Sequence, residues 1–334
     1  MPRAGGLVLV LVCSACSSPP SGSPLPSDGG VEAALPEGEC ADDLVERSMP
    51  LPSKGTVSAM AAGDAALFYA DFGGGPHEAG GLIGSIDTCG GSPRVIAREQ
   101  AAPFGLAASG GTVCWSNIGT NVGGRLLDDG SVQCNAGGST IIVVRDVNGP
   151  GAVATDGGAV AFILDFAVHL QGLRSGPPAK LYTSDGGVEA PADLRMDATS
   201  VFFTTGTDAA TGGALRVVPR DGGEARIVAE GRIGTLELDA THVYFTDRST
   251  AVLRRVAKSG GAATALANVS LDGAIAVDER HVYFKDLAQR LARIPKEGGA
   301  VESVRASSVG RALALAAGHV YWDSGGVFWR VRKP

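Results

Sequence analysis

Histidine is well suited to acid–base chemistry and metal binding near neutral pH, and three of the five histidines in this chain share one sequence context. His242, His281 and His319 each stand directly before a Val-Tyr-aromatic run. A metal ion needs its ligands in one coordination sphere, whereas equivalent positions of successive repeats lie far apart. Ser200 and Thr112 fill the same slot elsewhere, which is typical of a turn residue. We therefore expect these three histidines to be structural.

Aspartates recur in two places relative to the same runs. One set stands three or four residues before the run (Asp156, Asp197, Asp239, Asp278), and the other stands at its end (Asp71, Asp247, Asp286, Asp323). Two carboxylates that share acid–base work need unlike environments, and repetition predicts like ones. A short polar side chain before a strand favours an Asx-turn, in which the carboxylate bonds the backbone of its own turn. The first set is therefore predicted to form turns.

These recurrences belong to a repeat of about 40 residues. Residues 236–267 show it best, because four short runs suited to strands are separated by turns, and Gly260-Gly261 marks a hairpin. Seven copies are recognised by their central runs, which begin at Leu67, Val113, Val160, Val201, Val243, Val282 and Val320. Four strands per copy at this spacing are typical of propeller blades. The sequence predicts an all-β fold, a seven-bladed β-propeller.

The two ends of the chain are predicted to meet in one blade. The seventh copy stops at Pro334, after its third strand. Residues 44–50, just before the first copy, are similar to residues 301–304, the fourth run of the sixth copy. We expect this N-terminal strand to close the ring, because closure leaves no naked sheet edge. The propeller is then predicted to span residues 40–334.

The repeat resembles a known class of propeller. Residues 243–247 (VYFTD) and 282–286 (VYFKD) carry the resemblance to the YWTD-type blades of lipoprotein-receptor ectodomains. They are more closely similar to bacterial envelope lipoproteins with tandem VYWT-like repeats. The resemblance spans roughly residues 42–334 and implies a propeller with a structural aspartate at the end of each second strand. It implies no activity, since propellers host enzymes and binding modules alike.

Composition limits the class of partner. The 49 glycines fit a protein with many tight turns. The net charge is −7, the pI is near 5.3, and lysine and arginine form no large cluster. Nucleic-acid binding needs a concentrated basic footprint, so no nucleic-acid partner is expected. Propellers that resemble this one are usually monomeric, and we expect a monomer.

Residues 1–15 are predicted to be a lipoprotein signal peptide. Arg3 supplies the positive charge, residues 7–12 the apolar core, and Ser14-Ala15 the small residues before Cys16, the predicted lipidation site. A plain secretory signal cut nearby is the alternative. A transmembrane anchor is disfavoured, because the apolar run is far short of the ~20 residues needed to span a bilayer.

The segment after Cys16 fits an anchored domain. Residues 16–39 are rich in serine, proline and glycine and are predicted to be a disordered tether. Ser17 carries no aspartate-type inner-membrane retention signal. We therefore expect an exported protein that is lipid-anchored in the cell envelope, at the outer membrane, and that contacts the membrane through this anchor only.

Four cysteines remain beyond the signal region. An even number in an exported chain favours two disulfides, for which three connectivities exist. Cys114 begins the second strand of its blade and Cys134 ends the third, which favours Cys114–Cys134; Cys40 and Cys89 would then pair and clip the N-terminal segment to the ring. Buried free thiols are the alternative. No two of these cysteines have zinc-site spacing, and we expect no metal and no cofactor.

Departures from the repeat indicate where function lies. In a propeller, the second-to-third strand connections and the connections between blades share one face, around the channel mouth. The former are predicted to be long and irregular in the first three copies, where they carry His77, Asn121, Arg125, His169 and Arg174. Binding residues often lie on loops of a rigid scaffold, so a binding site is expected on this face. Loop drift without selection is the alternative.

Two functions remain open. The first is a non-enzymatic envelope protein that binds an envelope protein, peptide or glycan through these loops. The second is an enzyme resembling the propeller lyases that linearise streptogramin-type cyclic peptides, for which the resemblance implies a His–Glu pair and Mg²⁺ near the channel mouth. His77 and Glu78 are adjacent but form no signature of such a site. We favour the binding protein, with no catalytic residues.

Overall fold

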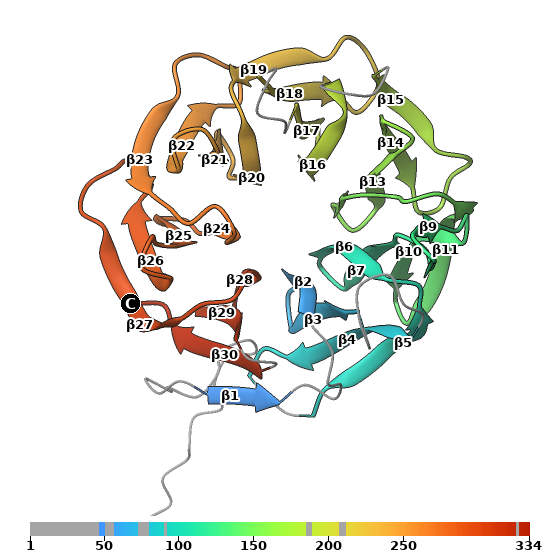
Figure 1. Cartoon of the computed structure of the whole chain (residues 1–334), viewed down its shortest axis with the longest axis horizontal. Helices are drawn as coiled ribbons and strands as arrows, with labels where there is room; N and C mark the ends of the chain where they lie inside the picture. Colours follow the sequence, from blue (N-terminus) through green and yellow to red (C-terminus); the bar gives the residue numbers. More distant parts are fainter. Residues whose placement is uncertain are drawn as a thin grey trace, which may run out of the picture. The chain divides into compact units, whose positions relative to one another are not determined.

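The computed structural model describes residues 47–50, 57–72, 80–89, 92–184, 189–206, 212–324 and 327–334, the side chains of 47–50 and 306–308 excepted. These residues belong to one compact unit, Leu35–Pro334. They form seven four-stranded antiparallel sheets arranged as blades around a centre (Figure 1). The predicted seven-bladed, all-β propeller is confirmed. The described residues contain no helix long and apolar enough to cross a membrane.

Each blade runs from its innermost to its outermost strand in chain order, except the last. Blade one contains β2 (Val57–Ala62), β3 (Ala66–Asp71), β4 (Gly81–Asp87) and β5 (Arg94–Gln100). Blade two contains β6 (Pro103–Ser109), β7 (Thr112–Asn117), β10 (Gly130–Ala136) and β11 (Ser139–Val147), with a small hairpin of β8 (Asn121–Val122) and β9 (Arg125–Leu126). Blade three contains β12 (Val153–Thr155), β13 (Ala159–Leu164), β14 (Ala167–Gly172) and β15 (Ala179–Thr183).

The later blades are more regular. Blade four contains β16 (Pro191–Met196), β17 (Ser200–Thr205), β18 (Ala214–Pro219) and β19 (Arg226–Glu230). Blade five contains β20 (Ile233–Leu238), β21 (His242–Asp247), β22 (Val252–Ala257) and β23 (Thr264–Asn268). Blade six contains β24 (Ile275–Val277), β25 (His281–Lys285), β26 (Arg290–Pro295) and β27 (Glu302–Ser308). Blade seven contains β28 (Leu313–Ala316), β29 (His319–Ser324), β30 (Val327–Arg332) and β1 (Arg47–Pro50).

The ring closes in the predicted way. The innermost strands contact one another in the cyclic order β2, β6, β12, β16, β20, β24, β28 and back to β2. The N-terminal strand β1 pairs antiparallel with β30, with Met49 opposite Phe328, and forms the outermost strand of blade seven (Figure 1). Both chain ends therefore contribute to one sheet, so no blade is left incomplete.

The second strand of each blade is the centre of the core. In β21, Phe245 packs toward blade four with Phe202 and Leu215, while its neighbour Tyr244 packs toward blade six with Phe284. Successive side chains of a strand point to opposite faces, so a strand buried on both faces requires a continuous apolar run. This requirement explains why the Val-Tyr-aromatic pattern recurs without polar alternation.

The recurring aspartates before the second strands form the predicted Asx-turns. Asp239 Oδ1 accepts hydrogen bonds from the backbone N–H of His242 at 2.7 Å and of Thr241 at 2.8 Å. Asp278 accepts the corresponding N–H of His281 at 2.8 Å. His242, His281 and His319 begin the second strands β21, β25 and β29, as expected for residues that follow a turn.

The same aspartates also join neighbouring blades. Each carboxylate forms an ion pair with a lysine or arginine that directly follows the third strand of the next blade. The pairs are Asp156–Arg220 (2.6 Å), Asp197–Lys258 (2.7 Å), Asp239–Lys296 (2.6 Å) and Asp278–Lys333 (3.3 Å). We call these four ion pairs the interblade clasp. They bridge every blade boundary from blade three to blade seven, on the face that carries the first-to-second strand turns.

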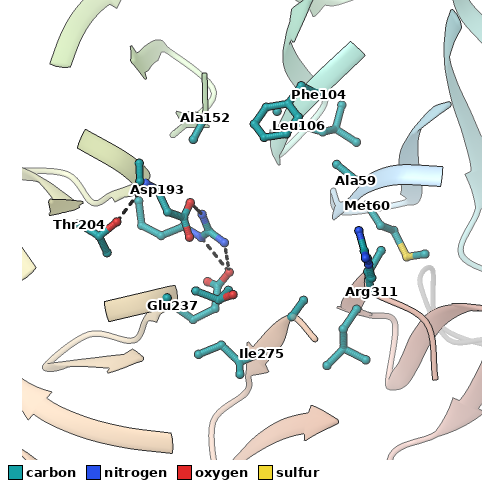
Figure 2. Close-up of a pocket in the computed structure, with 18 of the residues that line it drawn as sticks. Ala59, Met60, Phe104, Leu106, Ala152, Asp193, Thr204, Glu237, Ile275 and Arg311 are labelled. Carbon is teal, nitrogen blue, oxygen red and sulfur yellow. Dashed lines mark hydrogen bonds and ion pairs between the residues drawn. The ribbon is translucent and has the colours of Figure 1, made fainter. Parts of the chain in front are cut away.

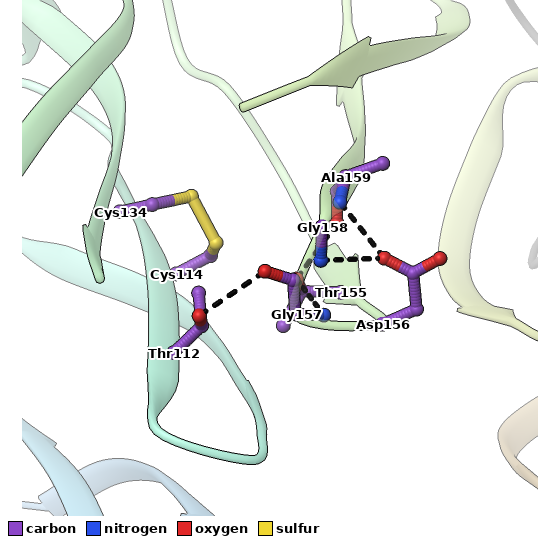
Figure 3. The surroundings of a disulfide bond; sticks show 8 residues. All are labelled: Thr112, Cys114, Cys134, Thr155, Asp156, Gly157, Gly158 and Ala159. Atoms are coloured by element: carbon purple, nitrogen blue, oxygen red, sulfur yellow. Dashed lines mark hydrogen bonds between the residues drawn. A yellow bond between two sulfur atoms is a disulfide. The ribbon is translucent and has the colours of Figure 1, made fainter. Parts of the chain in front are cut away.

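The predicted Cys114–Cys134 disulfide is present. Cys114 of β7 lies directly opposite Cys134 of β10, and both side chains are fully buried (Figure 3). Beside it, the hydroxyl of Thr112 donates to the Gly157 carbonyl at 3.2 Å and links blades two and three. Cys89 is also disulfide-bonded. Its predicted partner, Cys40, lies outside the described residues, so the Cys40–Cys89 pairing stays a prediction.

The clasp generates a prediction for Asp239→Asn. Burial alone would raise the pKa of Asp239, but hydrogen bonds from Lys296 and the turn amides outweigh it and hold the pKa well below its usual range. An amide cannot replace the charge that faces Lys296, so we expect a loss of about 1–3 kcal/mol of unfolding free energy at pH 7. Urea denaturation measures it.

The control is Asp221→Asn, in an exposed turn, which should change stability by less than about 0.5 kcal/mol. A depressed carboxyl pKa stabilises the fold above the unfolded pKa and loses this effect as pH falls. The difference between wild type and Asp239→Asn should therefore shrink below about pH 4. A difference that is absent at pH 7, or constant down to low pH, would contradict the clasp.

Candidate functional site in the central channel

The innermost strands line a central channel with two rings of residues. These strands start at the face that carries the connections between blades and the second-to-third strand connections, which we call the interblade face. The ring nearer this face surrounds a cavity of about 360 Å³ at the channel mouth and contains Ala59, Gly105, Ala152, Asp193, Thr235, Ala274 and Ala312. The deeper ring surrounds a cavity of about 270 Å³ and contains Ala61, Ala107, Ala154, Arg195, Glu237, Ala276 and Ala314.

The two rings are spaced by two residues along each strand, because alternate side chains of a strand point the same way. Five of the seven deeper positions are alanine, and the exceptions are Arg195 of blade four and Glu237 of blade five. These two strands are neighbours in the ring. The small residues keep the channel open, and the two large ones place charge on one side of its wall.

Arg195 is held by two carboxylates. Its Nε donates to Glu237 Oε1 at 2.8 Å, and its Nη1 lies 3.0 Å from Asp193 Oδ1 (Figure 2). Nη1 also donates to the Leu194 carbonyl at 2.8 Å. Asp193 in turn accepts the Leu236 N–H at 3.3 Å, which ties blade four to blade five. The three side chains form a fixed polar patch in the channel wall.

Burial shapes the electrostatics of this patch. Burial alone would lower the pKa of Arg195, but the charges of Asp193 and Glu237 outweigh it and raise the pKa. Burial raises the pKa of Glu237 above its usual value, and the attraction of Arg195 offsets only part of this effect. Because Glu237 already accepts hydrogen bonds from Arg195, it is bound to a permanent cation and is poorly placed to act as a free base.

Two further arginines lie at the channel mouth. Arg248 follows the second strand of blade five and Arg311 precedes β28 of blade seven, and both side chains are exposed. Both line the mouth cavity, and both also line an adjoining recess of about 400 Å³. Within the described part of the chain, neither guanidinium has a hydrogen-bond or ion-pair partner. Two unpaired cations therefore face one hollow surface.

The described residues among those predicted for binding do not lie on one loop face. His77 lies outside the described residues. Asn121 and Arg125 lie in the β8–β9 hairpin on the interblade face, which confirms an elaborated connection in blade two. There the Asn121 side chain accepts the Gly124 N–H at 2.9 Å and belongs to the turn, while Arg125 is exposed.

The prediction of a long loop in blade three is wrong. β13 ends at Leu164 and β14 begins at Ala167, so the connection is the two-residue turn Asp165-Phe166. His169 therefore lies within β14, where its ring stacks on Phe162 at a centroid distance of 5.2 Å, and burial lowers its pKa. Arg174 follows β14 and lies on the face opposite the predicted one.

The Asp165-Phe166 turn is unusual for its residues. Both have positive φ, 50° and 56°, a conformation that bulky residues rarely adopt. Glycine and asparagine normally mark such turns, and this sequence has neither there, so the turn signal was missing. The turn holds the Phe166 side chain 57 % exposed on the interblade face.

Other exposed apolar side chains lie on the same part of the interblade face. Val122 and Leu127 belong to the elaborated connection of blade two. Phe104, 46 % exposed, stands at the start of β6 and also lines the channel mouth (Figure 2). We call these three side chains and Phe166, all on the interblade face of blades two and three, the apolar arc. Leu287, 62 % exposed, lies on the same face in blade six.

The functional residues of the channel were not recognised in the sequence. Arg195 and Glu237 occupy a position where the other blades have alanine, but that equivalence requires the strand register. None of the residues that line the two channel cavities is a histidine. The described residues also contain no cluster of three or more histidine, cysteine, aspartate or glutamate side chains able to hold a metal ion.

Removing Arg195 tests the channel patch. In Arg195→Ala, Glu237 and Asp193 lose their shared cation, and we expect a loss of about 1–3 kcal/mol of unfolding free energy at pH 7. The pKa of Glu237 should rise further, so the loss should grow as pH increases through that pKa. The double variant Arg195→Ala/Glu237→Ala completes the ring of alanines and should recover most of the loss. Equal instability of the single and double variants, by urea denaturation, would contradict the pairing.

Comparisons with known proteins support the fold but identify no family for the chain. No protein-family model and no curated protein match the chain. Among solved structures, the virginiamycin B lyase of Staphylococcus aureus is similar, with 10 % identity, a TM-score of 0.66, and coverage of 87 % of this chain and 99 % of that one. The computationally designed Ika8 protein is 13 % identical, with a TM-score of 0.59 and coverage of 85 % of this chain and 99 % of that one. A chain of a nidogen/laminin complex is 16 % identical, with a TM-score of 0.50 and coverage of 69 % of this chain and 89 % of that one. Likenesses at such identities establish the propeller fold alone.

Proposed function

We infer that this protein is a non-enzymatic binding module that holds an extended protein or peptide segment on its interblade face, over blades two and three. The observation that carries the proposal is the apolar arc of Phe104, Val122, Leu127 and Phe166. Exposed apolar side chains that gather on one face indicate an interaction surface. Their position agrees with the expectation that binding is offset toward the first blades.

Phe166 gives the strongest support. A bulky residue at positive φ costs free energy, and such strain persists where the surrounding structure enforces it. In the free protein the strained Phe166 side chain is more than half exposed and gains little burial in return. Contact with a partner would supply that burial. The aliphatic members of the arc suit a protein segment better than a glycan.

The proposal includes an envelope location. The signal peptide, Cys16 and the serine- and proline-rich segment predicted from the sequence are those of an anchored, exported domain. The buried Cys114–Cys134 disulfide supports an oxidising compartment. The protein would then reach its partner from the outer membrane, with the membrane contacted through the lipid alone.

The apolar arc is tested by the triple variant Phe104→Ser/Val122→Ser/Phe166→Ser. Affinity capture from native cell envelopes, with the full chain as bait, should recover a partner with the wild type and lose at least about tenfold of it with this variant, because an interface core depends on a few buried apolar anchors.

The matched control is Ile142→Ser/Ile227→Ser/Val301→Ser, which removes three similarly exposed apolar side chains from the outer strands and the connection before β27. It should capture as the wild type does. Equal capture by all three baits would reject the arc as the binding surface, provided that thermal unfolding shows all of them folded.

The anchor is tested separately with Cys16→Ser. We expect wild-type cells to incorporate a labelled fatty acid into the protein and to hold it in the membrane fraction, because acylation provides the anchor. The variant should carry no label and should leave that fraction. An unlabelled wild-type protein would show that the signal is a plain secretory one.

A further inference from the structure

We propose that the channel mouth is a receptor for the free carboxyl terminus of a peptide that ends in an apolar residue. This inference rests on the proposed function and specifies how the bound segment ends. It follows from the mixed apolar and charged lining of the mouth cavity, the unpaired arginines beside it, and Phe104, which belongs both to this cavity and to the apolar arc.

The mouth cavity is lined by both apolar and charged residues. Met60, Phe104 and Leu106 of blades one and two line it, and so do Ile275 and Leu313 of blades six and seven. The charged lining residues are Asp193, Arg195, Glu237, Arg248 and Arg311, and Arg311 lies beside Met60, across the channel from Asp193 and Glu237 (Figure 2). At about 360 Å³ the cavity lies within the range of small-ligand sites. A ligand that fills it must offer both apolar and polar groups.

The charged groups without a partner determine which charge a ligand should carry. Asp193 and Glu237 share the single cation of Arg195, so this group offers no free cation and keeps a net negative charge. Arg248 and Arg311 have no partner among the described residues, and both line the mouth and its adjoining recess. Guanidinium groups bind carboxylates through paired N–H donors. The cavity therefore offers its free hydrogen-bond donors to an anion.

The Arg248 side chain lies close to a glycine, and the backbone beside Arg311 is hydrogen-bonded. The Arg248 side chain lies over Gly234 at the start of β20, where an added Cβ would approach Arg248 Nε to 3.0 Å. Around Arg311 the Gly310 N–H donates to the Asp323 carbonyl at 2.7 Å and the Ala312 N–H to Asp323 Oδ1 at 2.8 Å. A backbone held on both sides of Arg311 reduces the ordering cost of binding.

A monoanion fits better than a dianion. Asp272 lines the recess beside the two arginines and is half exposed, with Lys285 as its ion-pair partner at 3.0 Å. Glu237 and Asp193 lie further inside the mouth cavity. A phosphate would meet these carboxylates with twice the charge of a carboxylate ligand, so repulsion disfavours it. An apolar group next to a single carboxylate matches both the apolar and the cationic residues that line the cavity.

Continuity with the apolar arc favours a peptide over a small free acid. Phe104 belongs both to the arc and to the mouth cavity. A chain whose last residue enters the mouth past Phe104 has the exposed Val122 and Phe166 of blades two and three on the same face. A small acid would fill the mouth and leave the arc exposed.

The test uses two pooled libraries of N-acetylated hexapeptides that end in leucine or phenylalanine, one with free carboxyl termini and one with carboxamides. Retention on the full chain is read by affinity-selection mass spectrometry. Wild type is compared with Arg248→Gln/Arg311→Gln, and with Arg174→Gln/Arg280→Gln, which removes two exposed arginines from the opposite face. Thermal unfolding confirms that each variant is folded.

We expect the wild type and the control to retain free acids at least about tenfold over amides, and Arg248→Gln/Arg311→Gln to lose that preference. Equal retention of acids and amides would overturn the carboxylate receptor and leave peptide binding intact. Loss of the preference in the control as well would also overturn it. If neither library is retained while the arc still captures a partner, the terminus inference fails alone; if both experiments fail, the proposed function fails with it.

Discussion

The structure depends on how neighbouring blades are held in register. Each sheet is buried on both faces, so hydrophobic packing drives the blades together without fixing their relative height. From blade three to blade seven the aspartate turns supply that constraint, because one carboxylate bonds its own turn and a cation of the next blade, as in Asp239 with Lys296. A hydrogen bond from the Tyr244 hydroxyl at 2.9 Å adds the second strand to the same carboxylate. The Asp239 carboxylate therefore links its own turn, the second strand of its blade and the next blade.

The regular spacing of the blades determines which residues line the channel. Because the first strands stand at equivalent heights, alternate residues from every blade meet in rings, and one exceptional residue is sufficient to change the wall. Arg195 and Glu237 replace alanine in two adjacent blades and compensate each other. Asp193 adds a second carboxylate to this pair, so within the described part of the chain Arg248 and Arg311 are the mouth cations without a partner. The scaffold thus separates ion-paired residues in the channel wall from two unpaired arginines at its mouth.

Much of the fold followed from local patterns. Strand periodicity and glycine pairs gave seven blades, and the missing last strand gave the closure by β1. The Cys114–Cys134 pairing followed from strand order. The site did not, for two physical reasons. The Asp165-Phe166 turn has no glycine or asparagine at its two positive-φ positions, so the sequence predicts a long loop with His169 and Arg174 that does not exist. The channel rings depend on register, which shifts between Pro191 and Leu194 and between Ile233 and Leu236, and such shifts leave no sequence signal.

Closure by β1 also bears on the order in which the molecule folds. Blades one to six are each built from strands that follow one another in the chain, interrupted only by the β8–β9 hairpin in blade two, so their pairings are local and form early. Blade seven joins Arg47 to Arg330, the most distant pairing in the described sheets, and its loop closes only after the last strand is available. A chain that lacks β1 would hold β30 with an open edge, vulnerable to pairing with another molecule. The N-terminal strand β1 is synthesised first but can pair only after β30, the last strand, has been made. Its pairing therefore completes the ring.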